Sequence, residues 1–121
     1  MKIFDSQMEQ LSHERRDHFI AVMTEAVRED HPQQTQSLTD AQLRVHIEEA
    51  MSAALRYGIE MEGDIEAYVH LTFKHGLHFD HQLAWAAQIL NREDFTGPIR
   101  IDLLVAADEG RIPPPGNTFL P

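Results

Sequence analysis

Four histidines are crowded into the centre of this sequence, and histidine is the side chain that most often binds transition metals. They are His70, His75, His78 and His81, among eight histidines in 121 residues. Imidazole nitrogens suit zinc and nickel. The spacing argues against a shared ion, because ligands on one helix face stand four residues apart and His70 and His75 stand five apart. We therefore expect solvated or helix-terminal histidines and no bound metal, with a metal-dependent enzyme built on the His70–His81 cluster as an alternative.

A run of acidic residues precedes the histidines. It consists of Glu60, Glu62, Asp64 and Glu66, and no basic residue occurs between Arg56 and Lys74. Paired carboxylates can perform acid–base catalysis or bind calcium. The calcium-loop pattern of alternating Asp and Asn with a central glycine is missing, however. We interpret the run as a solvated loop and helix start, or as a docking patch for arginine or lysine on a partner.

Nucleophilic catalysis finds no support in the sequence. There is no cysteine, and no serine stands in the glycine-flanked elbow of the hydrolases. The six glycines are scattered, so no glycine-rich loop is present to cradle a phosphate. We therefore predict a protein that is not an enzyme, with no catalytic residue and no cofactor.

An apolar turn that follows residues 64–74 is the second candidate surface. It contains Leu77, Phe79, Asp80 and Trp85. Aromatic side chains dominate protein-binding hot spots as well as cores, and we expect Phe79 and Trp85 to be partly exposed. The predicted partner-binding set therefore combines the acidic run with this turn: Glu60, Glu62, Asp64, Glu66, Leu77, Phe79, Asp80 and Trp85.

The charge balance limits the classes of partner. The net charge is −10, from 20 acidic and 10 basic side chains. Phosphate backbones and anionic lipid surfaces repel such a chain, so we expect neither nucleic acid nor membrane as a partner. A larger protein with a basic face would be attracted. The N-terminus lacks a secretory signal pattern and no apolar run is long enough to span a membrane, so a cytoplasmic location is expected.

Apolar periodicity predicts helices throughout. Capping-box spacings place helix starts at Ser6 and Thr39, and these helices should end before Pro32 and at Gly58 respectively. A third helix is expected over residues 64–74. A fourth is expected from Asp80, as N-cap, to residue 91.

The segment from Pro98 to Glu109 is ambiguous. Its first residues alternate between apolar and polar side chains, as in a strand. No second strand candidate could pair with it, and Pro98 suits the first turn of a helix, so we predict a fifth helix. The chain should be an all-α, compact single-domain bundle of about five helices over residues 1–110. The tail at 111–121, with four of the six prolines, should be extended or disordered.

A set of residues in the central part of the chain resembles a known group of proteins. The matching residues are Tyr57-Gly58-Ile59, Asp64-Ile65, Tyr68-Val69, Gly76, Phe79-Asp80 and Trp85-Ala86-Ala87-Gln88-Ile89-Leu90. The run, within residues 40–107, is similar to small helical proteins encoded beside spike and effector genes in bacterial type VI secretion clusters. The resemblance implies a protein-binding accessory role as an effector-associated chaperone or adaptor. A second implied role is that of an immunity protein that neutralises a cognate toxin.

Overall fold

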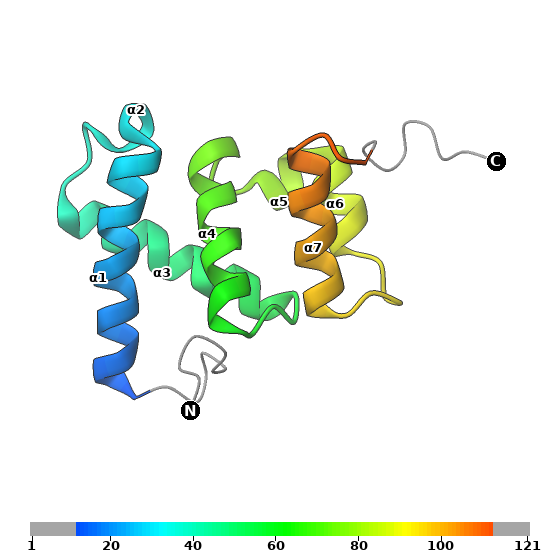
Figure 1. Cartoon of the computed structure of the whole chain (residues 1–121), viewed down its shortest axis with the longest axis horizontal. Coiled ribbons are helices and arrows are strands. Elements are labelled where there is room, and N and C mark those ends of the chain that lie inside the picture. Colours follow the sequence, from blue (N-terminus) through cyan, green and yellow to red (C-terminus); the bar gives the residue numbers. More distant parts are fainter. Residues whose placement is uncertain (1–11, 113–121) are drawn as a thin grey trace.

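The computed structural model describes residues 12–112, and within that range the chain consists of helices and their connections, with no β-strand (Figure 1). The helices are α1 (His13–Asp30), α2 (Pro32–Thr35), α3 (Asp40–Arg56), α4 (Glu62–His75), α5 (Phe79–Gln82), α6 (Ala84–Leu90) and α7 (Gly97–Asp108). Five of them have seven residues or more, so the predicted all-α bundle of about five helices is confirmed. None of the helices in this range is long and apolar enough to cross a membrane. The predicted helix start at Ser6 and most of the proline-rich tail lie outside the described residues.

Helix α4 is the central element. In Figure 1, α1, α4 and α7 stand side by side, and α3 passes behind them from α1 to the base of α4. Six of the fourteen residues of α4 are buried, and they cover more than one face. A helix that is apolar over so wide an arc is stable only when neighbours pack on several sides. The largest fully buried side chains are Tyr68, Phe79, Ile20, Met23, Leu43, Ile47, Met51, Ile59, Ile65, Leu90, Ile101 and Leu104.

Local sequence signals place the ends of α3 as predicted. The Thr39 hydroxyl accepts the backbone N–H of Gln42, and the Gln42 side chain accepts the N–H of Thr39, which completes a capping box. At the other end Gly58 has a φ of 78°, a left-handed conformation that glycine adopts at little cost. Both boundaries therefore follow from residues that satisfy terminal backbone groups.

The first helix begins later than its sequence pattern predicts. Ser12 is the N-cap, with extended backbone at ψ 167°, and its hydroxyl accepts the N–H of Arg15. A single unbroken helix from Ser6 through Ser12 is excluded, because the backbone of Ser12 is extended. The polar stretch after Ser12 is therefore the exposed first turn of α1. Helix α4 also differs from its prediction, because it begins at Glu62, two residues before the predicted start.

The predicted fourth helix is broken into two. Leu83 has φ −102° and ψ 119°, an extended conformation that ends α5 and begins α6. His78, and not Asp80, precedes the first helical residue, so the assignment of Asp80 as N-cap is wrong. Asp80 lies inside α5 with 2% of its surface exposed. The break separates α5 from α6, and the two short helices pack against each other.

The last helix is confirmed, and its start makes a close contact with the end of α3. Thr96 caps α7, Pro98 occupies its first turn, and Gly110 follows it with a φ of 77°. A Cβ atom on Gly97 would lie 1.8 Å from the carbonyl oxygen of Gly58. Only glycine at position 97 allows the two backbones to approach this closely.

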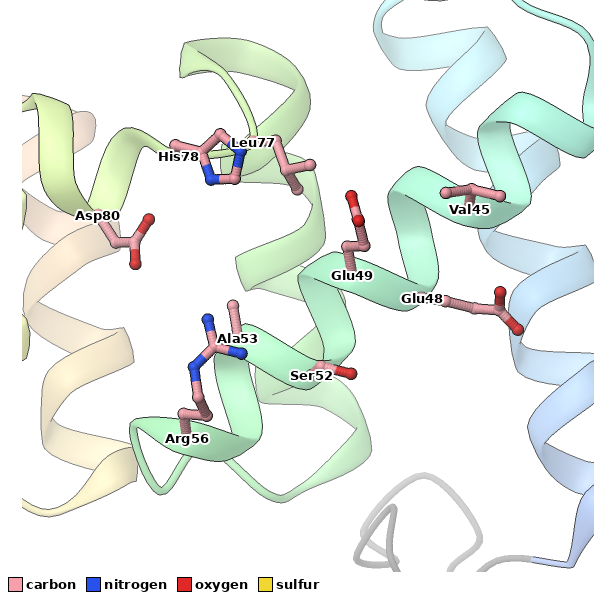
Figure 2. Close-up of a pocket in the computed structure, with 9 residues that line it drawn as sticks. All are labelled: Val45, Glu48, Glu49, Ser52, Ala53, Arg56, Leu77, His78 and Asp80. Carbon is pink, nitrogen blue, oxygen red and sulfur yellow. The ribbon is translucent and has the colours of Figure 1, made fainter.

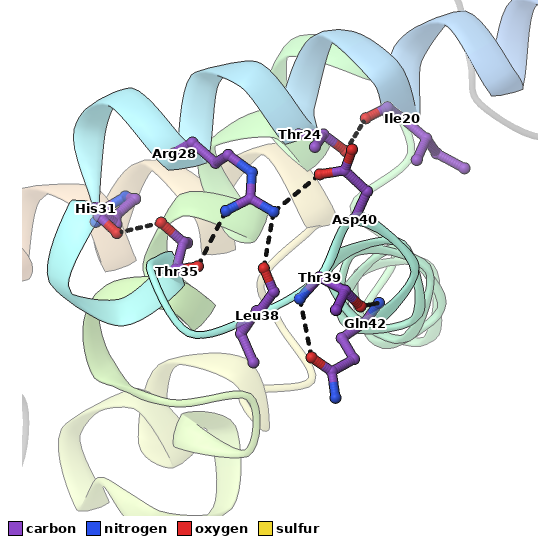
Figure 3. A network of polar contacts seen from close by, with 9 residues as sticks. All are labelled: Ile20, Thr24, Arg28, His31, Thr35, Leu38, Thr39, Asp40 and Gln42. Atoms are coloured by element: carbon purple, nitrogen blue, oxygen red, sulfur yellow. Dashed lines mark hydrogen bonds and ion pairs between the residues drawn. The ribbon is translucent and has the colours of Figure 1, made fainter.

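Arg28 joins α1, α2 and α3 at one corner of the molecule (Figure 3). Its Nη1 donates to the carbonyl of Thr35 at 3.1 Å, and its Nη2 donates to the carbonyl of Leu38 and to the Asp40 carboxylate, both at 2.8 Å. Hydrogen bonds from a charged donor are stronger than neutral ones. One guanidinium thus fixes the loop that leads from α2 into α3.

Candidate functional site

The structure separates the two halves of the predicted partner-binding set. The acidic run lies around the start of α4, whereas the Leu77–Trp85 turn follows its end (Figure 1). Fourteen helical residues span about 20 Å at 1.5 Å per residue. Sequence proximity therefore does not translate into one continuous surface, because α4 holds the two groups apart.

Most of the acidic run is partly covered by neighbouring residues. Glu62 has 15% of its side-chain surface exposed and lies 3.5 Å from Nη2 of Arg15 on α1. Burial, together with the nearby charge of Asp102, raises the pKa of Asp64 above its ordinary value. Glu60 is half-buried, and only Glu66 is fully on the surface. The run borders a shallow hollow between α1 and α4, lined by Arg15, His18, Phe19, Val22, Met23, Glu62, Gly63 and Glu66.

The Leu77–Trp85 turn contributes mainly to the core. Phe79 is fully buried against Tyr68 and His75, at ring-centroid distances of 5.3 and 6.1 Å, so the expectation that it is partly exposed is wrong. Burial of so large an apolar ring stabilises the fold and removes it from the surface. Trp85 is partly exposed, as predicted, and its ring meets that of His75 edge-on at 5.8 Å.

Asp80 is a buried carboxylate with a structural partner. The hydroxyl of Tyr57 donates to Asp80 Oδ2 at 2.6 Å, and His81 Nε2 lies 3.3 Å from the same oxygen. Burial and the bond to Asp80 raise the pKa of Tyr57 to about 12. The pair ties the end of α3 to α5, and its burial leaves Asp80 unavailable to a partner in this conformation.

Replacing Tyr57 with phenylalanine should lower the free energy of unfolding by about 1–3 kcal/mol at neutral pH, because the buried Asp80 carboxylate loses a donor. The native pKa of Tyr57 lies above that of the unfolded chain, so its contribution is complete below about pH 10 and falls as the pH rises toward 12. Urea unfolding at neutral and alkaline pH measures both effects. Equal stability of the two proteins at neutral pH would show that the bond contributes nothing.

A groove along α3 brings together residues from two distant parts of the sequence (Figure 2). It is lined by Val45, Glu48, Glu49, Ser52, Ala53, Arg56, Leu77, His78 and Asp80. The first six lie on one stripe of α3, and the last three belong to the connection between α4 and α5 and to α5 itself. Val45 has 55% of its surface exposed, the largest fraction among the big aliphatic side chains of residues 12–112. We call this surface the α3 groove.

The charges at the two ends of the α3 groove differ in sign and in pairing. Glu48 is held by Arg44 at 3.2 Å, and Arg44 also contacts Asp17 at 2.7 Å. Glu49 and Arg56 are exposed, and neither forms an ion pair within the described range of 12–112. Seven residues separate them on the same face of α3, about 10 Å along the helix axis. The groove therefore offers one available negative and one available positive charge.

The four central histidines diverge. His70 lies 3.0 Å from a ring nitrogen of His31, and His75 lies 2.6 Å from the Asp108 carboxylate. His81 contacts Asp80, and the His78 ring is 6.5 Å from that of His81. Among residues 12–112 no three His, Asp or Glu side chains are grouped so that they could hold a metal ion. The chain positions these imidazoles toward separate partners.

One sequence signal could have pointed to the α3 groove. Glu48, Glu49 and Arg56 occupy the polar face of α3, where they would ordinarily be solvated. Val45 interrupts this polar face, and an isolated aliphatic residue there is common and carries little information by itself. Val45 becomes informative only together with Leu77, and only the folded structure places the two residues in one groove.

Known proteins provide no further guide to the function of this arrangement. No protein-family model, no curated protein sequence and no solved structure matches this chain.

Proposed function

We propose that this chain is a non-catalytic protein-binding module that holds a segment of a partner protein in the α3 groove. The observation that carries the proposal is Val45, which is 55% exposed in a groove that also contains Ala53 and Leu77. Protein interfaces commonly combine an apolar centre with charged groups at the rim. The apolar residues contribute affinity, while the rim charges contribute specificity and rate.

The charge pattern of the groove defines the segment that fits it. Glu49 would pair with a lysine or arginine of the bound segment. Arg56 would pair with an aspartate or glutamate about 10 Å further along that segment. The segment also needs aliphatic side chains to cover Leu77 and Val45, which lies one turn before Glu49 on α3. A partner helix with opposite charges seven residues apart on one face meets these requirements, and the order of its charges fixes its direction along α3.

The net charge of −10 supports a partner that is basic overall, because opposite charge accelerates encounter. The resemblance to type VI secretion accessory proteins makes a secreted effector the first partner to test, with this chain as its chaperone or adaptor. An immunity role against a cognate toxin would use the same groove. The histidines behind the metal-dependent alternative contact separate groups, so we do not extend that alternative.

Two valines provide a matched test of the site. After a pull-down from the native host identifies the bound protein, its affinity is measured for Val45→Asp and for Val22→Asp. Both are exposed helical residues, at 55% and 46%, and Val22 lies in the separate hollow between α1 and α4. We expect Val45→Asp to weaken binding by about tenfold or more, because it removes an apolar contact and places a charge in the groove.

Val22→Asp should leave the affinity unchanged. Loss of binding with Val22→Asp alone would move the site to the hollow between α1 and α4. Unchanged binding with both variants would contradict the proposal. Thermal unfolding of each variant confirms that a change in affinity does not come from loss of the fold.

Charge reversal separates local pairing from long-range attraction. Glu49→Lys and Glu66→Lys change the net charge equally, but only Glu49 lies in the α3 groove. Both variants should slow association and make it less dependent on salt. Glu49→Lys should in addition accelerate dissociation, because it opposes a basic side chain of the bound segment. Stopped-flow mixing at two salt concentrations measures the two rate constants.

Co-expression distinguishes the chaperone from the immunity role. A chaperone or adaptor raises the abundance or secretion of its partner, whereas an immunity protein restores growth of cells that produce the toxin. Val45→Asp should abolish whichever effect is observed.

A further inference from the structure

Two histidines that are far apart in the sequence meet between α1 and α4. His31 ends α1 and precedes α2, and its Nε2 lies 3.0 Å from Nδ1 of His70 in the middle of α4. Both rings are half-buried. His31 also lies over Phe73, with ring planes 20° apart and centroids at 6.2 Å. The contact therefore connects the α1–α2 junction directly to the central helix.

The ring geometry is that of a direct hydrogen bond. The centroids are 5.2 Å apart for a nitrogen separation of 3.0 Å, so each nitrogen points almost straight at the other. Two imidazoles bound to one zinc ion at about 2.1 Å would place their nitrogens about 3.4 Å apart, turned toward a third point. One ring thus donates its N–H and the other accepts it.

Such a bond requires one nitrogen to carry no proton. A neutral imidazole has one donor and one acceptor nitrogen, whereas a protonated ring has two donors. When both rings are protonated, no lone pair remains to accept and two positive charges face each other. The contact then changes from attractive to repulsive.

His31 occupies a hinge-like position in the backbone. It has φ −131° and ψ 60°, and its carbonyl accepts both the N–H and the hydroxyl of Thr35 at 3.2 and 2.9 Å. The carbonyl of Thr35 in turn accepts from Arg28 (Figure 3). Through these bonds α2 is fixed to the residue whose ring contacts His70. Release of the ring therefore loosens the attachment of α2 to α4.

Charged side chains of both signs surround the two rings. The hollow that contains them is lined by Asp30, His31, Ala67, His70, Leu71, Lys74, Val105, Asp108 and Glu109. Asp30 Oδ2 lies 4.0 Å from His70 Nδ1 and is the carboxylate that would attract a protonated His70. Lys74 opposes protonation of His31, while Asp108 is already bound by Lys74 and His75.

We propose that the His31–His70 hydrogen bond is a proton-controlled latch, which holds the α1–α2 junction against α4 at neutral pH and releases it in mild acid. Burial, followed by the facing charge of His70, lowers the pKa of His31 from its ordinary value of 6.5. The unfolded or opened chain therefore binds protons more readily than the closed one. The stabilisation is complete above about pH 6.5 and is lost as the pH falls.

Native-state hydrogen exchange tests the latch in the full chain. The reporters are the amides of Thr35, Gln36 and Leu38, whose bonds lie within the α2 corner. After correction for intrinsic rates, their protection should fall about tenfold between about pH 7.5 and about pH 5.5. The amide of Phe73 in α4 serves as the reference for global unfolding. Equal loss of protection at α2 and at Phe73 would overturn the proposal.

His70→Gln supplies the decisive variant, because a glutamine amide does not titrate and can donate to neutral His31 through its NH2 group or accept from protonated His31 through its oxygen. The pH response of the α2 amides should disappear in this variant. His31→Gln should have the same effect and covers the case in which the first variant does not fold. Persistence of the full pH response in either folded variant would show that the two histidines do not control this corner.

Discussion

Gly97→Ala adds only one methyl group, but it should lower the free energy of unfolding by about 3 kcal/mol or more. The added Cβ would lie 1.8 Å from the Gly58 oxygen, 2.3 Å from its carbonyl carbon and 2.9 Å from the backbone nitrogen of Ile59. All three are backbone atoms, so no side chain can rotate away. The start of α7 would have to move from the end of α3.

Two other glycines, Gly63 and Gly58, serve as controls for this prediction. At Gly63 a new Cβ meets nothing within 4 Å and the backbone is helical, so Gly63→Ala should be neutral or stabilising by about 0.5 kcal/mol. At Gly58 the space is sufficient but the φ of 78° is unfavourable, so Gly58→Ala should cost about 1 kcal/mol. Urea unfolding of the three variants gives the order. A Gly97→Ala variant as stable as Gly63→Ala would show that the Gly58–Gly97 contact is not present in solution.

Arg100→Met should destabilise the protein by about 2–4 kcal/mol. Nη1 of Arg100 donates to the carbonyl of Tyr57 and Nη2 donates to the carbonyl of Arg92, both at 2.7 Å. Tyr57 is the C-cap of α3, and Arg92 follows the end of α6. The Tyr57 carbonyl lies at the C-terminus of α3, where carbonyls have no partner within the helix and carry partial negative charge, so the guanidinium caps α3 and ties it to the turn after α6.

Arg92→Met is the matched control for Arg100→Met. Arg92 has 56% of its side chain exposed and pairs with Asp94 two residues away, so its loss should change the stability by less than about 0.5 kcal/mol. Arg100→Lys should recover about half of the lost stability, because an ammonium group cannot form the planar, two-armed contact. Thermal and urea unfolding measure all three. An Arg100→Met cost no larger than that of Arg92→Met would show that the two bonds of Arg100 do not stabilise the fold.

These contacts meet at the Tyr57–Gly58 junction. The Tyr57 hydroxyl binds Asp80, the Tyr57 carbonyl binds Arg100, and the Gly58 carbonyl lies against Gly97. Helices α5 and α7 are therefore joined to the end of α3 by contacts at two adjacent residues. Changes at this junction should affect the α3 groove as well, since Asp80 lines it.

The sequence predicts elements whose ends depend on local chemistry. The capping box at Thr39 and the left-handed glycine at Gly58 act within a few residues of themselves, and both boundaries of α3 were found. Pro98 favours a helix start for the same reason. The break at Leu83 has no such signal, because its extended conformation is set by packing of α5 and α6. Asp80 resembles an N-cap in sequence, but the structure uses it as an acceptor for Tyr57.

The candidate site depends on tertiary contacts that periodicity does not contain. Leu77 belongs to the predicted set and does line the α3 groove, but its neighbours Val45 and Glu49 come from a helix about 30 residues earlier. His31 and His70 are 39 residues apart, so the spacing of the central histidines could not reveal their pairing. The sequence shows the acidic run as a cluster of charges but not that Glu60, Glu62 and Asp64 are partly covered by neighbouring residues. The distance between the acidic run and the Leu77–Trp85 turn is set by the length and direction of α4.

The contact between Trp85 and His75 gives the protein an internal optical reporter. The chain has a single tryptophan, so its tryptophan fluorescence comes from one indole, which meets the His75 imidazole edge-on at 5.8 Å. His75 ends α4 and is bound to Asp108 of α7, while Trp85 belongs to α6. Emission from this one ring therefore follows the docking of α4, α6 and α7 without any attached dye.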